Sequence, residues 1–281
     1  MNQKKVLLTA LLLLVFQVAI TAGEKLTVPS KGYRTIGKAV VKARRGDTII
    51  VKDGLYKESI YLKDGIVLLA ENKHKATIDG GGHGIAVTLG TGSTISGMVI
   101  TNATIGVFNK SPNTTVENCL IKQNWMTGVM AVRHLPQTND NTIVFNKASG
   151  IVVWDTRSIN TSIEHNTIAF NIGFGLYVGG TSEIVAENNT VAFNQKYGFK
   201  MSEESSKSKV TSNNFFDNLH AFYDMPTGNH SFDPQFKSPR VLMNFQPNAK
   251  CCAIRSPKNE NLGVRFSKTE LDMKPVKGTT K

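Results

Sequence analysis

Apolar and polar residues alternate with a period of two along much of this chain. In the segment 166–171 (NTIAFN), Ile168 and Phe170 alternate with small or polar neighbours, and the run 176–178 (LYV) alternates in the same way. A period of two is typical of β-strands, because successive side chains of a strand point to opposite faces. The pattern therefore predicts an all-β protein built from many short strands.

These segments form an internal repeat between Gly97 and Asn218. Each unit closes on an asparagine, successive asparagines are 22 to 25 residues apart, and a glycine follows most of them by four residues. The asparagines are Asn102, Asn124, Asn146, Asn171, Asn194 and Asn218, and the glycines are Gly106, Gly128, Gly150, Gly175 and Gly198. Such a period predicts a solenoid, because each unit has apolar residues that only the next unit can cover.

A repeat of this length has room for three short strands and three turns, and no gap is long enough for a crossover helix. We expect the asparagine column to form a ladder at one corner, in which side-chain amides bond to one another and to backbone groups. The repeat glycines are expected at corners that need a positive φ.

A different pattern precedes the repeats. The apolar residues of 36–43 have helical spacing, so this segment is expected to be a short helix that caps the open strand edges of the first coil. The glycine-rich segment 80–84, which contains His83, predicts a turn. The first strands are expected at 48–51, 59–62 and 66–69.

The repeats, together with the segments 33–60 and 76–82, resemble the right-handed parallel β-helix, or pectin-lyase-like, superfamily. The resemblance covers roughly residues 26–266 and implies one domain over 23–266, a single-stranded right-handed parallel β-helix or solenoid. Its expected parts are an N-terminal cap at about 26–46, repeats at about 47–224 and a C-terminal cap at about 225–266. No single activity is implied, because the superfamily includes lyases, hydrolases, epimerases, adhesins and non-catalytic proteins.

The two terminal segments differ in composition from a folded domain. Residues 1–22 read as a cleaved signal peptide, with Lys4 and Lys5 before an apolar run at 6–20 and small residues at the end. This apolar run is short for a membrane span, so we expect a secreted or periplasmic protein. Residues 267–281 are poor in apolar side chains and are expected to be a disordered basic tail.

The chain is strongly basic, with a formal net charge of +12. For an exported protein this charge favours an acidic polysaccharide or envelope glycan as partner, and no aromatic-basic motif for nucleic acid is present. A solvated basic surface without a partner is the alternative.

Three cysteines are few for a disulfide scaffold. Cys119 occupies a repeat position at which later units have asparagine, and it is expected to be a small buried residue. Cys251 and Cys252 are adjacent and have no histidine close by, so the sequence does not favour a metal role for this pair.

One outward column of side chains is unusually apolar and aromatic. The residues between inward-pointing neighbours include Met130, Tyr177, Lys200 and Tyr223, with Trp154 expected close by and longer loops following the same strand. Aromatic faces stack on sugar rings, and Lys or Arg bind carboxylates or sulfates. The predicted substrate-binding residues are Trp154, Tyr177, Tyr223, Met130, Asp155 and His134. A loop, the tail or a partner chain covering this face is the alternative.

The same face offers candidates for catalysis. Lys200 is the candidate base that abstracts the proton next to a uronic carboxylate, and Arg133 or Arg157 is the candidate cation that neutralises this carboxylate. Such chemistry is the β-elimination of a polysaccharide lyase.

A second outward column carries acidic and amide side chains. Its members are Glu117, Asn139, Glu164 and Glu187. Stacked carboxylates repel one another unless a cation bridges them, and calcium takes oxygen ligands of this kind. The column therefore predicts a calcium site, with solvated charges as the alternative. His165, beside this column, reads as a turn residue.

Three functions are compatible with these features. The sequence has no complete catalytic motif, which favours an exported β-helix protein that binds acidic polysaccharide or envelope glycan without catalysis. A polysaccharide lyase, or a related enzyme acting on a uronic-acid glycan, is the first alternative. A NosD-like periplasmic metal-delivery protein shares the repeat style and is the second alternative, although the chain has no obvious His or Met cluster.

Overall fold

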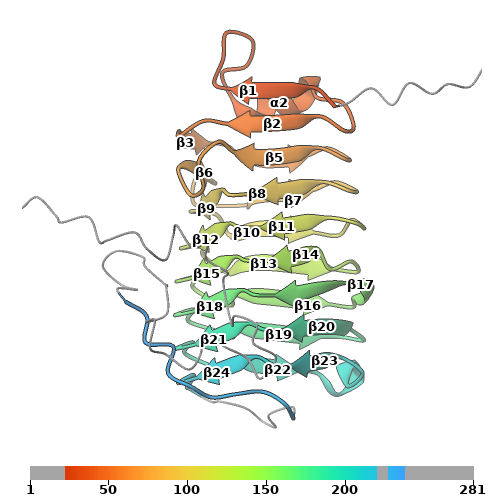
Figure 1. Ribbon diagram of the computed structural model, residues 1–281, viewed down its shortest axis with the longest axis vertical. Coiled ribbons are helices and arrows are strands. Elements are labelled where there is room, and N and C mark those ends of the chain that lie inside the picture. The colour runs from red at the N-terminus through yellow and green to blue at the C-terminus, as the bar shows by residue number, and fades with distance from the viewer. Residues whose placement is uncertain (1–22, 220–226, 238–281) are drawn as a thin grey trace, which may run out of the picture.

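The computed structural model describes residues 23–219 and 227–237, which wind into a parallel β-helix of stacked coils (Figure 1). Every strand pairing in it is parallel, and strands of successive coils lie side by side in three sheets. One short helix lies at the N-terminal end. The fold class expected from the repeats is therefore confirmed. The predicted signal peptide, Tyr223, Cys251, Cys252, most of the predicted C-terminal cap and the tail lie outside the described residues.

The three sheets, here called A, B and C, run along the length of the solenoid. Sheet A consists of β1 (Lys25–Val28), β2 (Thr48–Val51), β5 (Val67–Ala70), β8 (Thr94–Ser96), β11 (Thr115–Glu117), β14 (Gln137–Asn139), β17 (Arg157–Glu164), β20 (Glu183–Glu187) and β23 (Lys209–Thr211). Sheet B consists of β3 (Gly54–Lys57), β6 (Ala76–Asp79), β9 (Val99–Thr101), β12 (Leu120–Lys122), β15 (Thr142–Val144), β18 (Thr167–Ala169), β21 (Thr190–Ala192) and β24 (Asn214–Phe216). Sheet C consists of β4 (Ile60–Leu62), β7 (Ile85–Leu89), β10 (Ile105–Asn109), β13 (Thr127–Val132), β16 (Ile151–Trp154), β19 (Leu176–Gly179) and β22 (Phe199–Met201).

The core consists of columns of apolar side chains that point into the solenoid. In sheet B one such column stacks similar residues in strict register along seven strands, and all of them are buried. Its members are Ile78, Ile100, Ile121, Ile143, Ile168, Val191 and Phe215. Because each coil covers the apolar face of the next, burial of these columns stabilises the stack as a whole.

Two asparagine ladders support the corners on either side of the sheet B strands. In the first ladder every amide oxygen after that of Asn124 accepts hydrogen bonds from the backbone N and the Nδ2 of the asparagine one coil earlier, at 2.8 to 3.1 Å. This ladder contains Asn124, Asn146, Asn171, Asn194 and Asn218. The predicted ladder is thereby confirmed for these five residues.

The second ladder uses the residue that precedes each sheet B strand. It contains Asn141, Asn166, Asn189, Asn213 and Asn229, with the same pair of bonds at each step. Cys119 heads this column, and its backbone N donates to Asn141 Oδ1 at 2.9 Å. Cys119 is fully buried, as predicted.

Asn102 does not belong to the first ladder, which corrects the sequence alignment by one residue. The backbone N of Ala103 donates to Asn124 Oδ1, while Asn102 has a φ of 55° and its Nδ2 donates to Asp79. A left-handed residue precedes each ladder asparagine, and asparagine tolerates that conformation. Asn102 therefore takes the turn position rather than the ladder position.

The expected conformation of the repeat glycines was wrong. None of the five is among the glycines with positive φ, and the left-handed corner positions are held by residues such as Phe145 and Phe170. A Cβ at Gly128 would lie 2.8 Å from the Gly150 oxygen and 2.6 Å from Ile143 Cγ2. Glycine is required at this position because successive coils approach too closely for a side chain.

The N-terminal cap agrees with the sequence pattern. Helix α2 (Ile36–Lys42) buries Ile36, Ala39 and Val40 against the first coil, and Glu58 accepts hydrogen bonds from the first backbone N–H groups of the helix. His83 lies exposed in the predicted glycine-rich turn.

Candidate functional site

The outward column of sheet C is assembled as the alternation predicts. Phe108, Met130, Val152, Tyr177 and Lys200 are paired in register on five successive strands. The first four are half-buried, and Lys200 is exposed. The structure thus brings Tyr177 and Lys200 side by side and places Met130 two coils away from Tyr177.

Trp154 lies next to Tyr177 at the end of β16. The two rings are stacked, with centroids 6.2 Å apart and an interplanar angle of 24°, and Trp154 is 43% exposed. A Cβ at Gly179 would lie 2.5 Å from the indole ring, so glycine lets the indole lie flat on the neighbouring strand. The structure therefore places two of the predicted sugar-binding residues, Trp154 and Tyr177, in a stacked pair.

Two further aromatic residues extend this site and were not identified from the sequence. The Phe174 ring lies 5.3 Å from that of Tyr177 and 6.1 Å from that of Tyr197. Lys196 Nζ lies 5.6 Å from the Phe174 centroid, and Lys200 Nζ lies 5.5 Å from the Tyr197 centroid, within the range of cation–π attraction. We call Trp154, Phe174, Tyr177, Lys196, Tyr197 and Lys200 the aromatic–lysine surface.

The sequence signal for the missed aromatics is their phase in the repeat. Phe174 and Tyr197 each directly precede a repeat glycine, where the earlier units have Thr127 and Ser149. Both lie in turns, and strand alternation does not predict the direction of a turn side chain.

The predicted polar residues lie on the turns between sheets C and A. Arg133 is exposed, with a φ of 68°, and its backbone N donates to the Trp154 oxygen. His134 is exposed, and its backbone oxygen accepts from Asn109 Nδ2 at 2.8 Å. Asp155 Oδ1 accepts from the Thr181 backbone N at 3.0 Å, so this carboxylate supports the next turn.

Arg157 begins β17 in sheet A, opposite Glu183 of the next coil. Arg133 and Arg157 therefore both lie at the edge beyond Trp154 and not in the column that contains Lys200. The predicted roles of these residues in substrate binding and catalysis remain predictions.

The acidic column of sheet A is in register, as Glu117, Asn139, Glu164 and Glu187 pair on successive strands. Glu187 forms an ion pair with Lys209, and this contact raises the pKa of Lys209. Throughout the described part of the chain, no group of three or more His, Cys, Asp or Glu is arranged to hold a metal ion. The calcium site at the acidic column therefore remains a prediction, and no such cluster supports it among the described residues.

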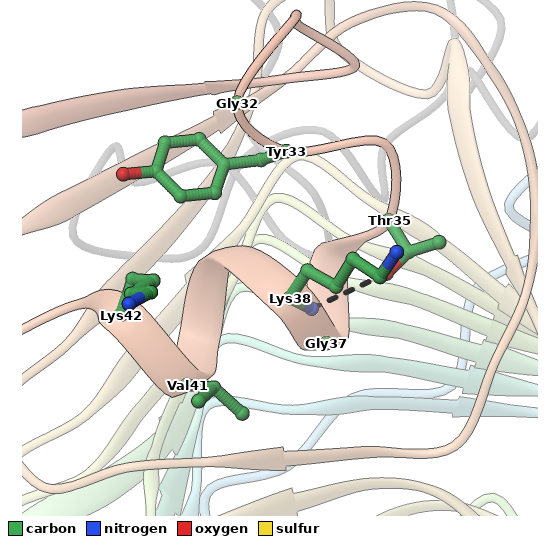
Figure 2. Close-up of a pocket in the computed structure, with 7 residues that line it drawn as sticks. All are labelled: Gly32, Tyr33, Thr35, Gly37, Lys38, Val41 and Lys42. Atoms are coloured by element: carbon green, nitrogen blue, oxygen red, sulfur yellow. Dashed lines mark hydrogen bonds between the residues drawn. The ribbon is translucent and has the colours of Figure 1, made fainter.

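The N-terminal end contains a hollow that the sequence did not indicate. A cavity of about 470 Å³ lies between the loop at Gly32–Tyr33 and helix α2 (Figure 2). It is lined by Gly32, Tyr33, Thr35, Gly37, Lys38, Val41 and Lys42. A second hollow of about 560 Å³ lies nearby, beside Arg44, Arg45 and Tyr61.

The family of this chain follows from a comparison with models of known protein families. The model of the family described as periplasmic copper-binding protein (NosD) matches residues 42–241, which include most of the β-helix. The chain belongs to the NosD family. This NosD-family chain has no match among curated proteins.

Solved structures similar to this NosD-family chain include two pectin methylesterases. The deglycosylated enzyme from Aspergillus niger is 15% identical, with a TM-score of 0.39, and the match covers 76% of this chain and 91% of the enzyme. PemA from Erwinia chrysanthemi is 10% identical, with a TM-score of 0.36, and the match covers 81% of this chain and 99% of the enzyme. At these values neither structure bears on the activity of this chain.

The family is described as periplasmic, in agreement with the expected export of this chain. Among the described residues, no helix has the length and apolar character needed to cross a membrane.

Proposed function

We propose that this NosD-family chain binds copper(I) in the periplasm and holds it for delivery to a copper-dependent partner. The observation that carries this proposal is the family match, which extends over residues 42–241. The stacked coils form a rigid stem, so a metal site on this chain must be built from side chains at its surface or its ends.

Ligand chemistry narrows the residues that could hold the ion. Copper(I) prefers thiolate and thioether sulfur. Cys119 is unsuitable, because burial raises its pKa to about 12 and the thiol stays protonated. Cys251 and Cys252 are the remaining thiols of the sequence. The absence of a nearby histidine counts against a zinc site at this pair, but copper(I) needs only sulfur ligands, so the pair is our first candidate. The accessible thioethers Met126, which is 50% exposed, and Met130 are the second candidates.

Anaerobic titration with copper(I) against the chelator bicinchoninate tests the proposal on protein recovered after export. We expect the wild-type chain to withhold copper from the chelator. The double variant Cys251→Ser/Cys252→Ser should lose at least roughly 100-fold in affinity, because removing a direct ligand costs more than disturbing its supporting shell. Cys119→Ala is the matched control and should retain full affinity.

Two outcomes separate the copper function from its ligands. If Met126→Leu/Met130→Leu abolishes binding and the cysteine variant does not, the copper function stands and the ions are held beside β13. A wild-type chain that yields all its copper to the chelator would overturn the proposal.

The aromatic–lysine surface supports a second candidate function, the binding of an acidic polysaccharide or envelope glycan. Four aromatic rings and two lysines are contiguous on one flank, and none of the six residues is acidic. Arg133 and Arg157 add positive charge at the neighbouring edge. Aromatic rings stack on sugars, while lysine and arginine attract carboxylates.

The geometry favours binding over lyase chemistry at this surface. Lys200 is exposed on an outward strand face, whereas proton abstraction by a side-chain base is favoured in a site that excludes water. Retention on pectate and alginate columns tests binding, and ultraviolet absorbance of unsaturated products tests elimination. Trp154→Ala/Tyr177→Ala should abolish retention, and Tyr61→Ala, an exposed aromatic of the same sheet, is the control. Unchanged retention in the double variant would contradict glycan binding here, while product formation lost in Lys200→Ala would establish the lyase.

A further inference from the structure

The segment that closes the N-terminal end of the solenoid is strongly basic. Residues 25–45, which form β1, the following loop and helix α2, include seven Lys or Arg and no Asp or Glu. These basic residues are Lys25, Lys31, Arg34, Lys38, Lys42, Arg44 and Arg45. Two neighbouring carboxylates form hydrogen bonds within the fold: Asp47 accepts from the backbone N of Glu24 and of Arg44, and Glu58 accepts from the first backbone N–H groups of helix α2. The end therefore presents a positive potential to any surface that approaches it.

An exposed apolar side chain lies among these charges. Helix α2 buries Ile36, Ala39 and Val40, but Val41 on its opposite side is 73% exposed. Figure 2 shows Val41 with Lys38 and Lys42 around the hollow, and Tyr33 on the loop facing the helix. An exposed apolar side chain between lysines can enter the headgroup region of an anionic membrane while the lysines meet the phosphates. The basic charge and the exposed valine at this end point to the same partner, an anionic membrane surface.

We propose that the N-terminal end of the solenoid docks on an anionic membrane surface, through phosphate groups that meet Lys38, Lys42, Arg44 and Arg45. Val41 contacts the acyl boundary beneath the headgroups. Attachment at one end leaves the long flanks, including the aromatic–lysine surface, directed away from the membrane. Because the contact is electrostatic and small, it weakens as salt is added.

Co-sedimentation of the exported protein with lipid vesicles tests this proposal. We expect binding to vesicles that contain phosphatidylglycerol and little binding to vesicles of phosphatidylcholine alone. Lys38→Gln/Lys42→Gln should lower the partition coefficient by roughly tenfold or more, since each basic residue near an anionic surface contributes about a fivefold effect. Val41→Ser should lower it by a further factor of about three.

Matched variants on the flank provide the controls. Lys110→Gln/Lys207→Gln removes the same charge from exposed positions outside the aromatic–lysine surface, and Ile172→Ser removes an exposed apolar side chain, so both should bind vesicles like the wild type. Equal binding to neutral and anionic vesicles, or an equal loss in the flank variants, would overturn the proposal. So would retention of soluble acidic polysaccharide through Lys38 and Lys42 without vesicle binding. None of these three outcomes depends on whether the chain binds copper.

Discussion

The coils before Ala103 and the coils after it satisfy the backbone groups of their turns in different ways. In the early coils single carboxylates accept hydrogen bonds from backbone N–H groups, at distances of 2.7 to 2.9 Å. These carboxylates belong to Asp47, Glu58, Asp64 and Asp79. In the later coils the two asparagine ladders accept these bonds at the corners beside sheet B, with each interior amide bonded to the amides above and below it. Asp155 still serves one turn between sheets C and A as the early carboxylates do.

The difference follows from the chemistry of the two groups. An amide both donates and accepts, so the same residue can repeat in every coil and join an unbroken chain of bonds. A carboxylate only accepts, and carboxylates stacked on successive coils would repel one another. The ladders can therefore extend over many coils, whereas each carboxylate serves one turn. We expect the first coil to depend on pH through Asp47, whose pKa is lowered by the hydrogen bonds that it accepts, and the uncharged amide ladders to be insensitive to pH.

The largest expected effect is the loss of a central ladder amide. Asn171→Ala removes the acceptor of the backbone N and Nδ2 of Asn146 and leaves Asn194 Oδ1 with one donor fewer, all of them buried. We expect a destabilisation of about 3 kcal/mol, because buried polar groups lose their partners. Denaturant unfolding measures it, with exposed Gln195→Ala as the control. A loss below about 1 kcal/mol would mean that the ladder contributes little.

A repeat glycine should be nearly as sensitive as the ladder. A Cβ at Gly150 would lie 2.4 Å from Ile168 Cγ2 and 2.8 Å from the Gly175 oxygen. Gly150→Ala should therefore cost about 2 kcal/mol through overpacking. Gly32→Ala is the control, because its Cβ would meet nothing closer than 3.9 Å. Equal melting temperatures for the two variants would contradict the close approach of the coils.

A smaller effect is expected at a carboxylate of the early coils. Hydrogen bonds from the backbone N of Arg44 and of Glu24 lower the pKa of Asp47 below its ordinary value of 3.8. The folded state thus favours the charged form, so this stabilisation is complete above the ordinary value and is lost as pH falls through the lowered one. Asp47→Asn should cost about 1 kcal/mol at neutral pH and flatten the acid limb of the stability profile. An unchanged limb would show that Asp47 does not govern it.

The smallest expected effect on stability lies on the sheet C flank. Trp154 is partly exposed and stacks on Tyr177, so Trp154→Ala should cost less than about 1 kcal/mol. Thermal unfolding measures this cost, and a large loss would assign the indole to the core instead of to a binding surface.

The sequence predicted the fold because a solenoid repeats its physical constraints in every coil. Period-two alternation placed Ile168 inward and Tyr177 outward, and the recurrence of asparagine predicted the ladder. The register failed at Asn102, because asparagine suits both the ladder and the left-handed turn before it. The role of Gly128 was mistaken because glycine serves either positive φ or close approach, and the pattern does not distinguish them.

The candidate site was predicted only where it lies on strands. Alternation along the strands predicts that Lys200 and Tyr177 point outward. Phe174 and Tyr197 precede their strands, where alternation does not predict the direction of a side chain. The hydrogen bond that Asp155 accepts from the Thr181 backbone N cannot be predicted from the sequence pattern either. The ligand does not follow from the fold, since an outward β-helix face accommodates many chemistries. The copper(I) proposal therefore rests on the NosD family match and not on the fold.

Backbone hydrogen exchange at neutral pH and at about pH 3 tests the contrast between the two regions most directly, after correction for intrinsic exchange rates. We predict that the backbone N–H groups of Asn146, Asn171 and Asn194 keep their protection at both pH values, while those of Glu24 and Arg44, which donate to Asp47, lose protection in acid. Equal loss of protection in both sets, or rapid exchange of the ladder asparagines at neutral pH, would contradict the account.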